Sequence, residues 1–148
     1  MRPARDHVVR LVPLAVLGLA AACGGGSSDL KLGERERDCA AVTAAARQIV
    51  LVNPRTASPE DVERNKVAST ALDAAAASAS TEVATSARTL AASAKAYVEA
   101  LERRDAQRAT ANEGLLRQQA VPVAQACGYG NRADLVLGTT SGTGGQGG

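Results

Sequence analysis

Few residues of this 148-residue chain could carry out nucleophilic or acid–base chemistry. The single histidine is His7, so the rest of the chain has no imidazole to act as a general base or a metal ligand. A Ser-x-x-Lys string, Ser28–Lys31, lies in a Gly/Ser-rich stretch, where chance explains it better than a nucleophile does. The acids of Glu60–Glu63 could bind a cation, but acids in a first helical turn more often stabilise the helix dipole. We therefore expect no catalysis, no metal and no cofactor.

The composition also disfavours nucleic acid as a partner. Aromatic residues make up 1% of the chain, with two Tyr and no Phe or Trp. The formal net charge of +2 is accounted for by Arg2, Arg5 and Arg10 against Asp6, so the remainder is neutral. The chain thus has neither a basic field nor aromatic platforms on which bases could stack. Its preference for Arg, Ala, Gly and Val is typical of a high-GC bacterial genome, such as that of an actinobacterium.

The amino-terminal residues have the layout of a bacterial export signal. The basic first ten residues precede an uncharged run, Leu11–Ala22, and then Cys23. This run is too short to span a membrane, which takes about 20 apolar residues, and Pro13 and Gly18 interrupt it. A removed signal over residues 1–22 is therefore the prediction.

The segment "LAAAC", Leu19–Cys23, resembles the lipobox of bacterial lipoproteins. Ala21 and Ala22 fit its small-residue positions, while Ala20 stands where the family usually has Leu. The resemblance implies that Cys23 is lipidated on its thiol and becomes the new amino terminus. It also implies a lipid anchor in the cell membrane, facing the extracytoplasmic side. Secretion without a lipid is the alternative.

The residues after the anchor predict four segments of different character. Residues 23–33 comprise the lipidated Cys23 and a Gly/Ser tether that we expect to be a flexible coil. Residues 34–128 should form a helical bundle domain, and residues 129–148 a disordered Gly/Thr-rich tail. Within that tail, "ADLVL", Ala133–Leu137, could fold back on the bundle or offer a short strand to a partner; folding back is favoured.

The domain itself has a helical pattern. Residues 60–113 contain neither Gly nor Pro and are rich in Ala, the best helix former. Apolar residues recur every three or four positions in four stretches, as on one face of a helix. These are Cys39, Val42, Ala46 and Ile49; Ala68, Leu72, Ala75 and Ala79; Val83, Ala87, Leu90, Ala94, Tyr97 and Leu101; and Leu116, Ala120, Val123 and Cys127.

Cap and breaker residues indicate where these helices begin and end. We expect breaks at Asn53-Pro54, a start capped by Ser58 before Pro59, a join near Ser78–Thr81, a start at Asp105 or Thr110 with Asp105 preferred, and an end at Cys127-Gly128.

The two remaining cysteines decide the number of helices. Cys39 lies near the start of the first helix and Cys127 at the end of the last, and in an exported domain they should pair. In an up-and-down bundle these positions share an end only when the number of helices is even. We therefore predict an all-α, antiparallel four-helix bundle closed by a Cys39–Cys127 disulfide, worth about 4.6 kcal/mol at most in chain entropy.

Two stretches could form an interaction patch. Ile49–Val52 is apolar on all sides of the expected last turn of the first helix, so Val50 or Val52 could be exposed; burial under the following loop is the alternative. Arg103, Arg104 and Arg108 belong to a dense charge run, either a solvated helix end or a docking patch.

A seam lined by Ala brings helices close together, so we expect a surface groove rather than an internal chamber as any binding site. The leading prediction is a membrane-anchored structural or protein-interaction module, without catalysis, whose partner is an unidentified envelope protein. The alternative is a sensor or binding module for a small molecule, a lipid or a cell-wall fragment in a helix-face groove. An enzyme is the third possibility.

Overall fold

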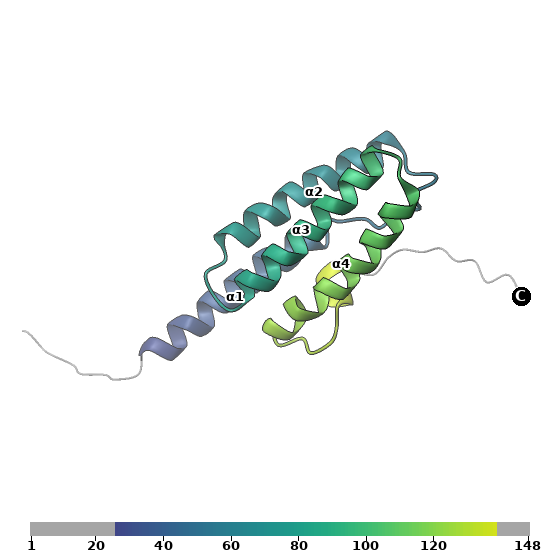
Figure 1. Ribbon diagram of the computed structural model, residues 1–148. Helices are drawn as coiled ribbons and strands as arrows, with labels where there is room; N and C mark the ends of the chain where they lie inside the picture. The colour runs from purple at the N-terminus through teal and green to yellow at the C-terminus, as the bar shows by residue number, and fades with distance from the viewer. Residues whose placement is uncertain (1–25, 139–148) are drawn as a thin grey trace, which may run out of the picture.

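The computed structural model describes residues 26–138, and within that part no strand is present. Four long helices alternate in direction: α1 (Gly26–Ala46), α2 (Pro59–Ser78), α3 (Val83–Glu102) and α4 (Ala106–Ala126), followed by the short α5 (Asp134–Leu137) (Figure 1). The predicted all-α four-helix bundle, closed by a Cys39–Cys127 disulfide, is confirmed. The predictions for the signal, for Cys23 and for the last ten residues lie outside the described residues.

Side chains cap the helices at the predicted starts. The Ser58 hydroxyl accepts a hydrogen bond from the Asp61 amide at 3.1 Å, and the Asp61 carboxylate accepts one from the Ser58 amide at 3.0 Å. This reciprocal pair satisfies two amides that a helix start would leave free. At α4 the Asp105 carboxylate accepts from the Arg108 amide at 3.0 Å. Asp105 is therefore the cap, as preferred, and Thr110 lies inside the helix.

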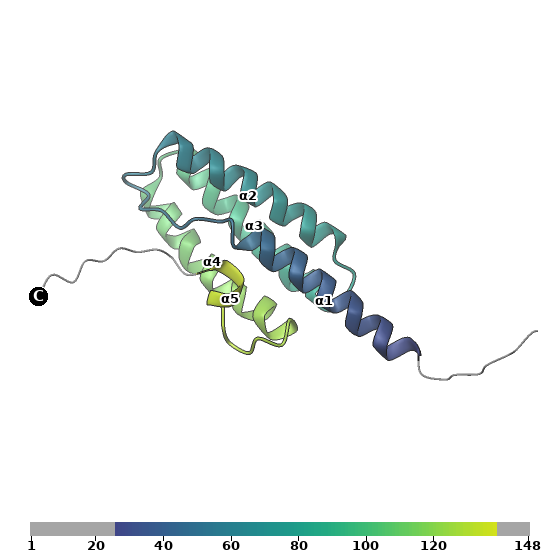
Figure 2. The same ribbon diagram turned by 180° about the vertical axis from the view of Figure 1, so that it is seen from behind.

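The first helix begins earlier than predicted. We expected a flexible tether up to residue 33, but α1 starts at Gly26 and its first turns extend beyond the ends of α2 and α3 (Figures 1 and 2). An isolated Gly within a helix costs about 1 kcal/mol relative to Ala. Gly33 is isolated in this way, with good helix formers such as Leu32 and Glu34 on both sides. The tether prediction is therefore wrong from Gly26 onward.

The first helix also ends earlier than predicted. Ile49–Val52 was expected to form its last turn before Asn53-Pro54, but α1 ends at Ala46 and this segment runs on without helical structure. Three of its four residues are β-branched, which lowers their preference for a helix. The prediction that this segment is helical is wrong.

Two buried polar side chains pair with the backbone of this segment. Asn65 of α2 accepts from the Val50 amide at 2.9 Å and donates to the Val50 carbonyl at 3.0 Å. The Tyr97 hydroxyl of α3 accepts from the Val52 amide at 3.0 Å. Both side chains are 0% exposed, and burial raises the pKa of the Tyr97 phenol, although its hydrogen bond to Val52 opposes this. The non-helical backbone is thus fixed by α2 and α3.

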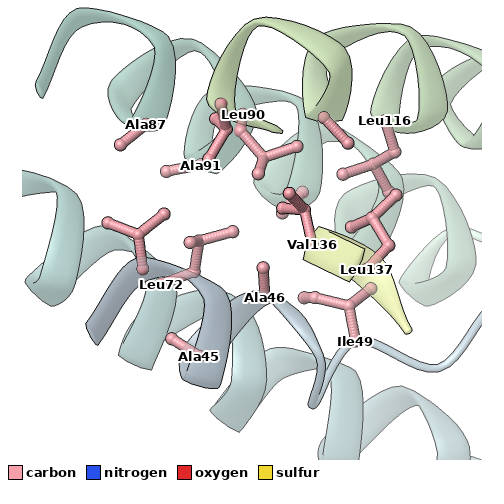
Figure 3. Close-up of a cluster of buried hydrophobic side chains, with 14 of the residues drawn as sticks. Ala45, Ala46, Ile49, Leu72, Ala87, Leu90, Ala91, Leu116, Val136 and Leu137 are labelled. Atoms are coloured by element: carbon pink, nitrogen blue, oxygen red, sulfur yellow. The ribbon is translucent and has the colours of Figure 1, made fainter. Parts of the chain in front are cut away.

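The core follows the predicted seams. All six positions of the longest predicted stripe are buried in α3. Small residues such as Ala46, Ala87 and Ala91 lie between larger ones such as Leu72 and Leu90 (Figure 3). Because the interior is filled in this way, the helices pack closely around an alanine-lined seam.

The predicted tail forms part of the fold. Val136 and Leu137 of α5 are buried, and the Arg47 Nε donates to the Leu135 carbonyl at 2.9 Å. Seen from behind, α5 lies beside α4 near the end of α1 (Figure 2). Of the two possibilities for "ADLVL", the structure has the folded-back one, and the predicted domain boundary at residue 128 is wrong because residues 129–138 belong to the fold.

Asp38 of α1 holds the turn between α2 and α3. Its Oδ2 accepts from the Ser80 amide at 3.0 Å, the Thr81 amide at 3.0 Å and the Thr81 hydroxyl at 2.7 Å. Partial burial raises the pKa of Asp38, but these hydrogen bonds outweigh it, so the pKa lies below its ordinary value of 3.8. The ionised carboxylate is therefore the form that the fold prefers.

Acid should weaken this contact. Because the pKa of Asp38 is lowered by folding, its contribution to stability is present above pH 3.8 and is lost as the pH falls through the folded-state pKa. We expect Asp38→Asn to be less stable than the wild type at neutral pH, with a difference that shrinks steadily below pH 3.8. Urea unfolding of both proteins at a series of pH values measures this, and a constant difference would contradict it.

Candidate functional site

The cysteine pair has a structural role. The Cys39 and Cys127 sulfurs are 2.11 Å apart and their Cα atoms 5.6 Å apart, joining the middle of α1 to the residue after α4. Both sulfurs are bonded and Cys39 is buried. This pair therefore offers no thiolate for chemistry, and the only other cysteine, Cys23, lies outside the described residues.

The structure places the residues of the predicted interaction patch in two separate settings. Val50 is 38% exposed, whereas Val52 is half-buried and packs against the core. Arg103, Arg104 and Arg108 are exposed around the turn between α3 and α4. Of these five residues, Arg104 lines a cleft.

Two clefts flank the loop of residues 53–57, at the end of the bundle opposite the amino terminus of α1 (Figure 1). The first, of 670 Å³, lies between this loop, the start of α2 and the α3–α4 turn, and its lining includes Arg55, Glu63 and Arg104. The second, of 730 Å³, lies between the loop and the first turns of α4, where Gln107 lines it. We call this region the distal end.

Arg104 has an unusual backbone conformation at the distal end. Its φ of 55° is left-handed, and among the described residues no other non-glycine residue has a positive φ. The amides of Arg104 and Asp105 donate to the carbonyls of Leu101 and Ala100, which is the hydrogen-bond pattern of a helix end that usually has Gly at this position. Gly128 ends α4 in the same way. The chain thus has an arginine where backbone geometry favours glycine.

Replacing Arg104 with glycine should therefore stabilise the fold. The left-handed conformation costs a residue with a Cβ about 1–2 kcal/mol, part of which the greater chain entropy of glycine cancels. We expect Arg104→Gly to raise the free energy of unfolding by about 0.5–1 kcal/mol. The control is Arg103→Gly, at a φ of −79°, which should lower it. Thermal unfolding measures both, and a destabilised Arg104→Gly protein would contradict the strain argument.

A third cleft runs between α2 and α3. It has a volume of 430 Å³, and Ala91 and Val98 form part of its apolar floor. The Lys66 Nζ lies 3.3 Å from a Glu102 carboxylate oxygen among the lining residues. Four further charged side chains line the groove and make no ion pair among the described residues: Asp73, Arg88, Lys95 and Glu99.

This α2–α3 groove is a surface groove on a helix face, as the sequence analysis expected of any binding site. The sequence did not indicate between which helices it would lie. Its volume exceeds the 300 Å³ or so at which ligand pockets begin. Helical spacing places Arg88, Ala92, Lys95 and Glu99 on one face of α3, which was the signal available. The charges of both signs around an apolar floor would suit a ligand that is itself zwitterionic.

Two of the three acids in Glu60–Glu63 have local partners. Glu60 pairs with Arg64 at 3.3 Å, and Asp61 is used in the cap of α2. In residues 26–138 no three potential metal-ligating side chains come together. Ser28–Lys31 belongs to α1, but its side chains lie outside those described. No helix of the described chain is long and apolar enough to cross a bilayer.

These features define a class of structure: an alanine-rich, disulfide-closed four-helix bundle with clefts on its surface and at its distal end. No protein family, no curated protein and no solved structure matches the chain.

Proposed function

We propose that this chain is a lipid-anchored, extracytoplasmic lipoprotein that acts as a protein-interaction module rather than as an enzyme. The lipobox-like segment Leu19–Cys23 supports the anchor, and the disulfide supports an oxidising compartment outside the cytoplasm. Every described carboxyl group with a clearly shifted pKa has it lowered by hydrogen bonds, at Asp38, Asp61 and Asp134. Such carboxylates suit structural roles better than proton transfer.

The observation on which this proposal depends is the geometry of α1 and the distal end. Helix α1 begins three residues after Cys23 and continues into the bundle. At 1.5 Å per residue, the part of α1 that precedes its first contacts with the α2–α3 turn, made by Arg35 and Asp38, is about 12 Å long and would separate the bundle from the lipid. A bundle anchored in this way would present Arg55, Arg103 and Arg104 away from the membrane. We propose that a partner with an acidic surface binds there.

The anchor is tested by Cys23→Ser. Without a thiol to lipidate, the protein should leave the membrane fraction, or remain there with its signal uncleaved and a correspondingly higher mass. Fractionation of cells followed by mass spectrometry distinguishes these results. An unchanged membrane fraction of normally processed protein would argue against lipidation.

The interaction is tested by placing a photocrosslinking residue at Gln107, which lines a distal cleft, and as a control at Thr85 in the first turn of α3. A defined adduct from the first position alone is expected. It should weaken when Arg103 and Arg104 are both changed to Glu, because an acidic partner would then be repelled. Equal adducts from both positions would contradict distal binding.

The α2–α3 groove favours a second candidate function, the binding of a small zwitterionic ligand. A peptidoglycan stem peptide, which carries carboxylates and an ammonium group, has this chemistry. Titration with a soluble stem peptide should shift the NMR signals of Arg88 and Lys95, and Ala92→Trp should abolish the shifts by filling the groove. Shifts that persist in the Trp variant would exclude this site.

A further inference from the structure

Helix α5 occupies a gap in the bundle. Each long helix packs along the next one in sequence, but α1 and α4 make little direct contact. Instead α5 lies between them and contacts both. Figure 3 shows its Val136 and Leu137 near Ala46 and Ile49 from one side and Leu116 from the other. The fourth edge of the bundle is thus closed by a separate piece of chain.

Two buried side chains and one side-chain hydrogen bond hold α5 in this groove, and Tyr129 and Ala133 before it pack partly against the core. Val136 is 0% exposed and Leu137 is 8% exposed, so both aliphatic side chains are inserted into the core. The Arg47 Nε donates to the Leu135 carbonyl at 2.9 Å, a contact to backbone that any peptide could supply. The groove therefore recognises two adjacent aliphatic side chains and one carbonyl group.

The segment is also built to come away from the groove. A helix of four residues has no stability of its own. Glycines with positive φ lie on both sides of it, at Gly128, Gly130 and Gly138, where the backbone can turn without strain. The gain from burying two side chains is similar in size to the entropy lost on ordering four residues. Opening of α5 alone should thus be far easier than unfolding of the bundle.

We propose that α5 is a displaceable plug, and that the groove beneath it is a docking site for a partner protein's segment with two adjacent aliphatic side chains. Such a segment would insert its side chains where Val136 and Leu137 lie and offer a carbonyl to Arg47. This inference rests on the proposed function as an interaction module and adds a second surface to it. The chemistry of the occupant is that of α5, which fills the same space.

The opening is tested first, by hydrogen exchange on the wild-type full chain in lipid nanodiscs. The amides of Val136 and Leu137 both donate to the Ala133 carbonyl at 3.0 Å, so they report on the plug. They should exchange at least 100-fold faster than the amide of Leu90 in the core. Exchange at the same rate as Leu90, meaning only with global unfolding, would overturn the proposal.

Docking is tested with a labelled synthetic peptide of residues 131–138 as the probe. A full-chain variant with Val136→Ser and Leu137→Ser should open the plug and bind the peptide at least tenfold more tightly than the wild type. A peptide with the same two changes should bind at least tenfold more weakly. Equal binding to both proteins, or no binding to a variant that keeps its helical circular dichroism, would overturn the proposal. So would a wild-type dimer that exchanges α5 between copies, since the second copy would then be the occupant.

These outcomes are independent of the anchor. A plug that fails to open leaves the Cys23→Ser result unchanged, and a protein that proves to be unlipidated can still open and bind the peptide.

Discussion

Replacing Cys39 and Cys127 together with alanine should lower the free energy of unfolding by about 4 kcal/mol, a large share of the roughly 5–15 kcal/mol that stabilises a typical domain. The disulfide joins residues 88 apart in sequence, so its removal returns a large amount of entropy to the unfolded chain. It also ties α1, which otherwise packs mainly on α2 and α5, to the end of α4. Urea unfolding followed by circular dichroism measures the loss.

The control for this prediction is chemical reduction. Dithiothreitol should destabilise the wild type by about the same amount and leave the double alanine variant unchanged. Reduction should also loosen α5, which begins seven residues after Cys127. A loss below about 1 kcal/mol would mean that the packing of α1 on α2 is sufficient without the covalent link.

The second large effect is expected at Asn65. Asn65→Ala leaves the amide and the carbonyl of Val50 without their partners, and an unsatisfied buried group costs about 1–3 kcal/mol. Since Val50 is 38% exposed, water can replace part of this loss. We expect a total destabilisation of about 2 kcal/mol, measured by urea unfolding.

Val67→Ala serves as the matched control on the same helix. Val67 is 59% exposed, so its truncation should change stability by less than about 0.5 kcal/mol. Equal effects at the two positions would show that the Val50 segment does not depend on Asn65. Faster hydrogen exchange at the Val50 amide in the Asn65 variant would link the loss to this contact.

Sequence periodicity predicted the parts of the fold that depend on local pattern. The stripe from Val83 to Leu101 is strictly spaced and rich in apolar residues, and the structure buries all of it. The number of helices followed from parity, because an expected Cys39–Cys127 pair at the two ends of the bundle requires an even number. Both the pair and four long helices are found, although the early start of α1 places Cys39 in its middle rather than near its start. The first inference used the spacing of residues along one helix, and the second used the alternating direction of successive helices.

The ends of α1 could not be predicted in the same way. Its carboxyl end is fixed by Asn65 and Tyr97, which lie 15 and 45 residues from Val50 and Val52 in sequence. The sequence does not reveal which backbone segment the side chain of an Asn within a helix will form hydrogen bonds with. The α2–α3 groove was missed for a related reason: whether Asp73, Arg88 and Lys95 find ion-pair partners, and none of them does among the described residues, depends on how α2 and α3 are aligned.

Because α1 is continuous, the orientation of the bundle relative to its anchor depends on the number of residues in the first turns of this helix. Each residue added between Gly26 and Glu34, before α1 contacts the α2–α3 turn, would turn everything beyond it by about 100° and raise it by about 1.5 Å. Adding seven residues would lift the distal end by about 10 Å yet keep it facing nearly the same way. The length of this helix therefore sets both the height of the distal end above the membrane and the direction in which it faces a partner.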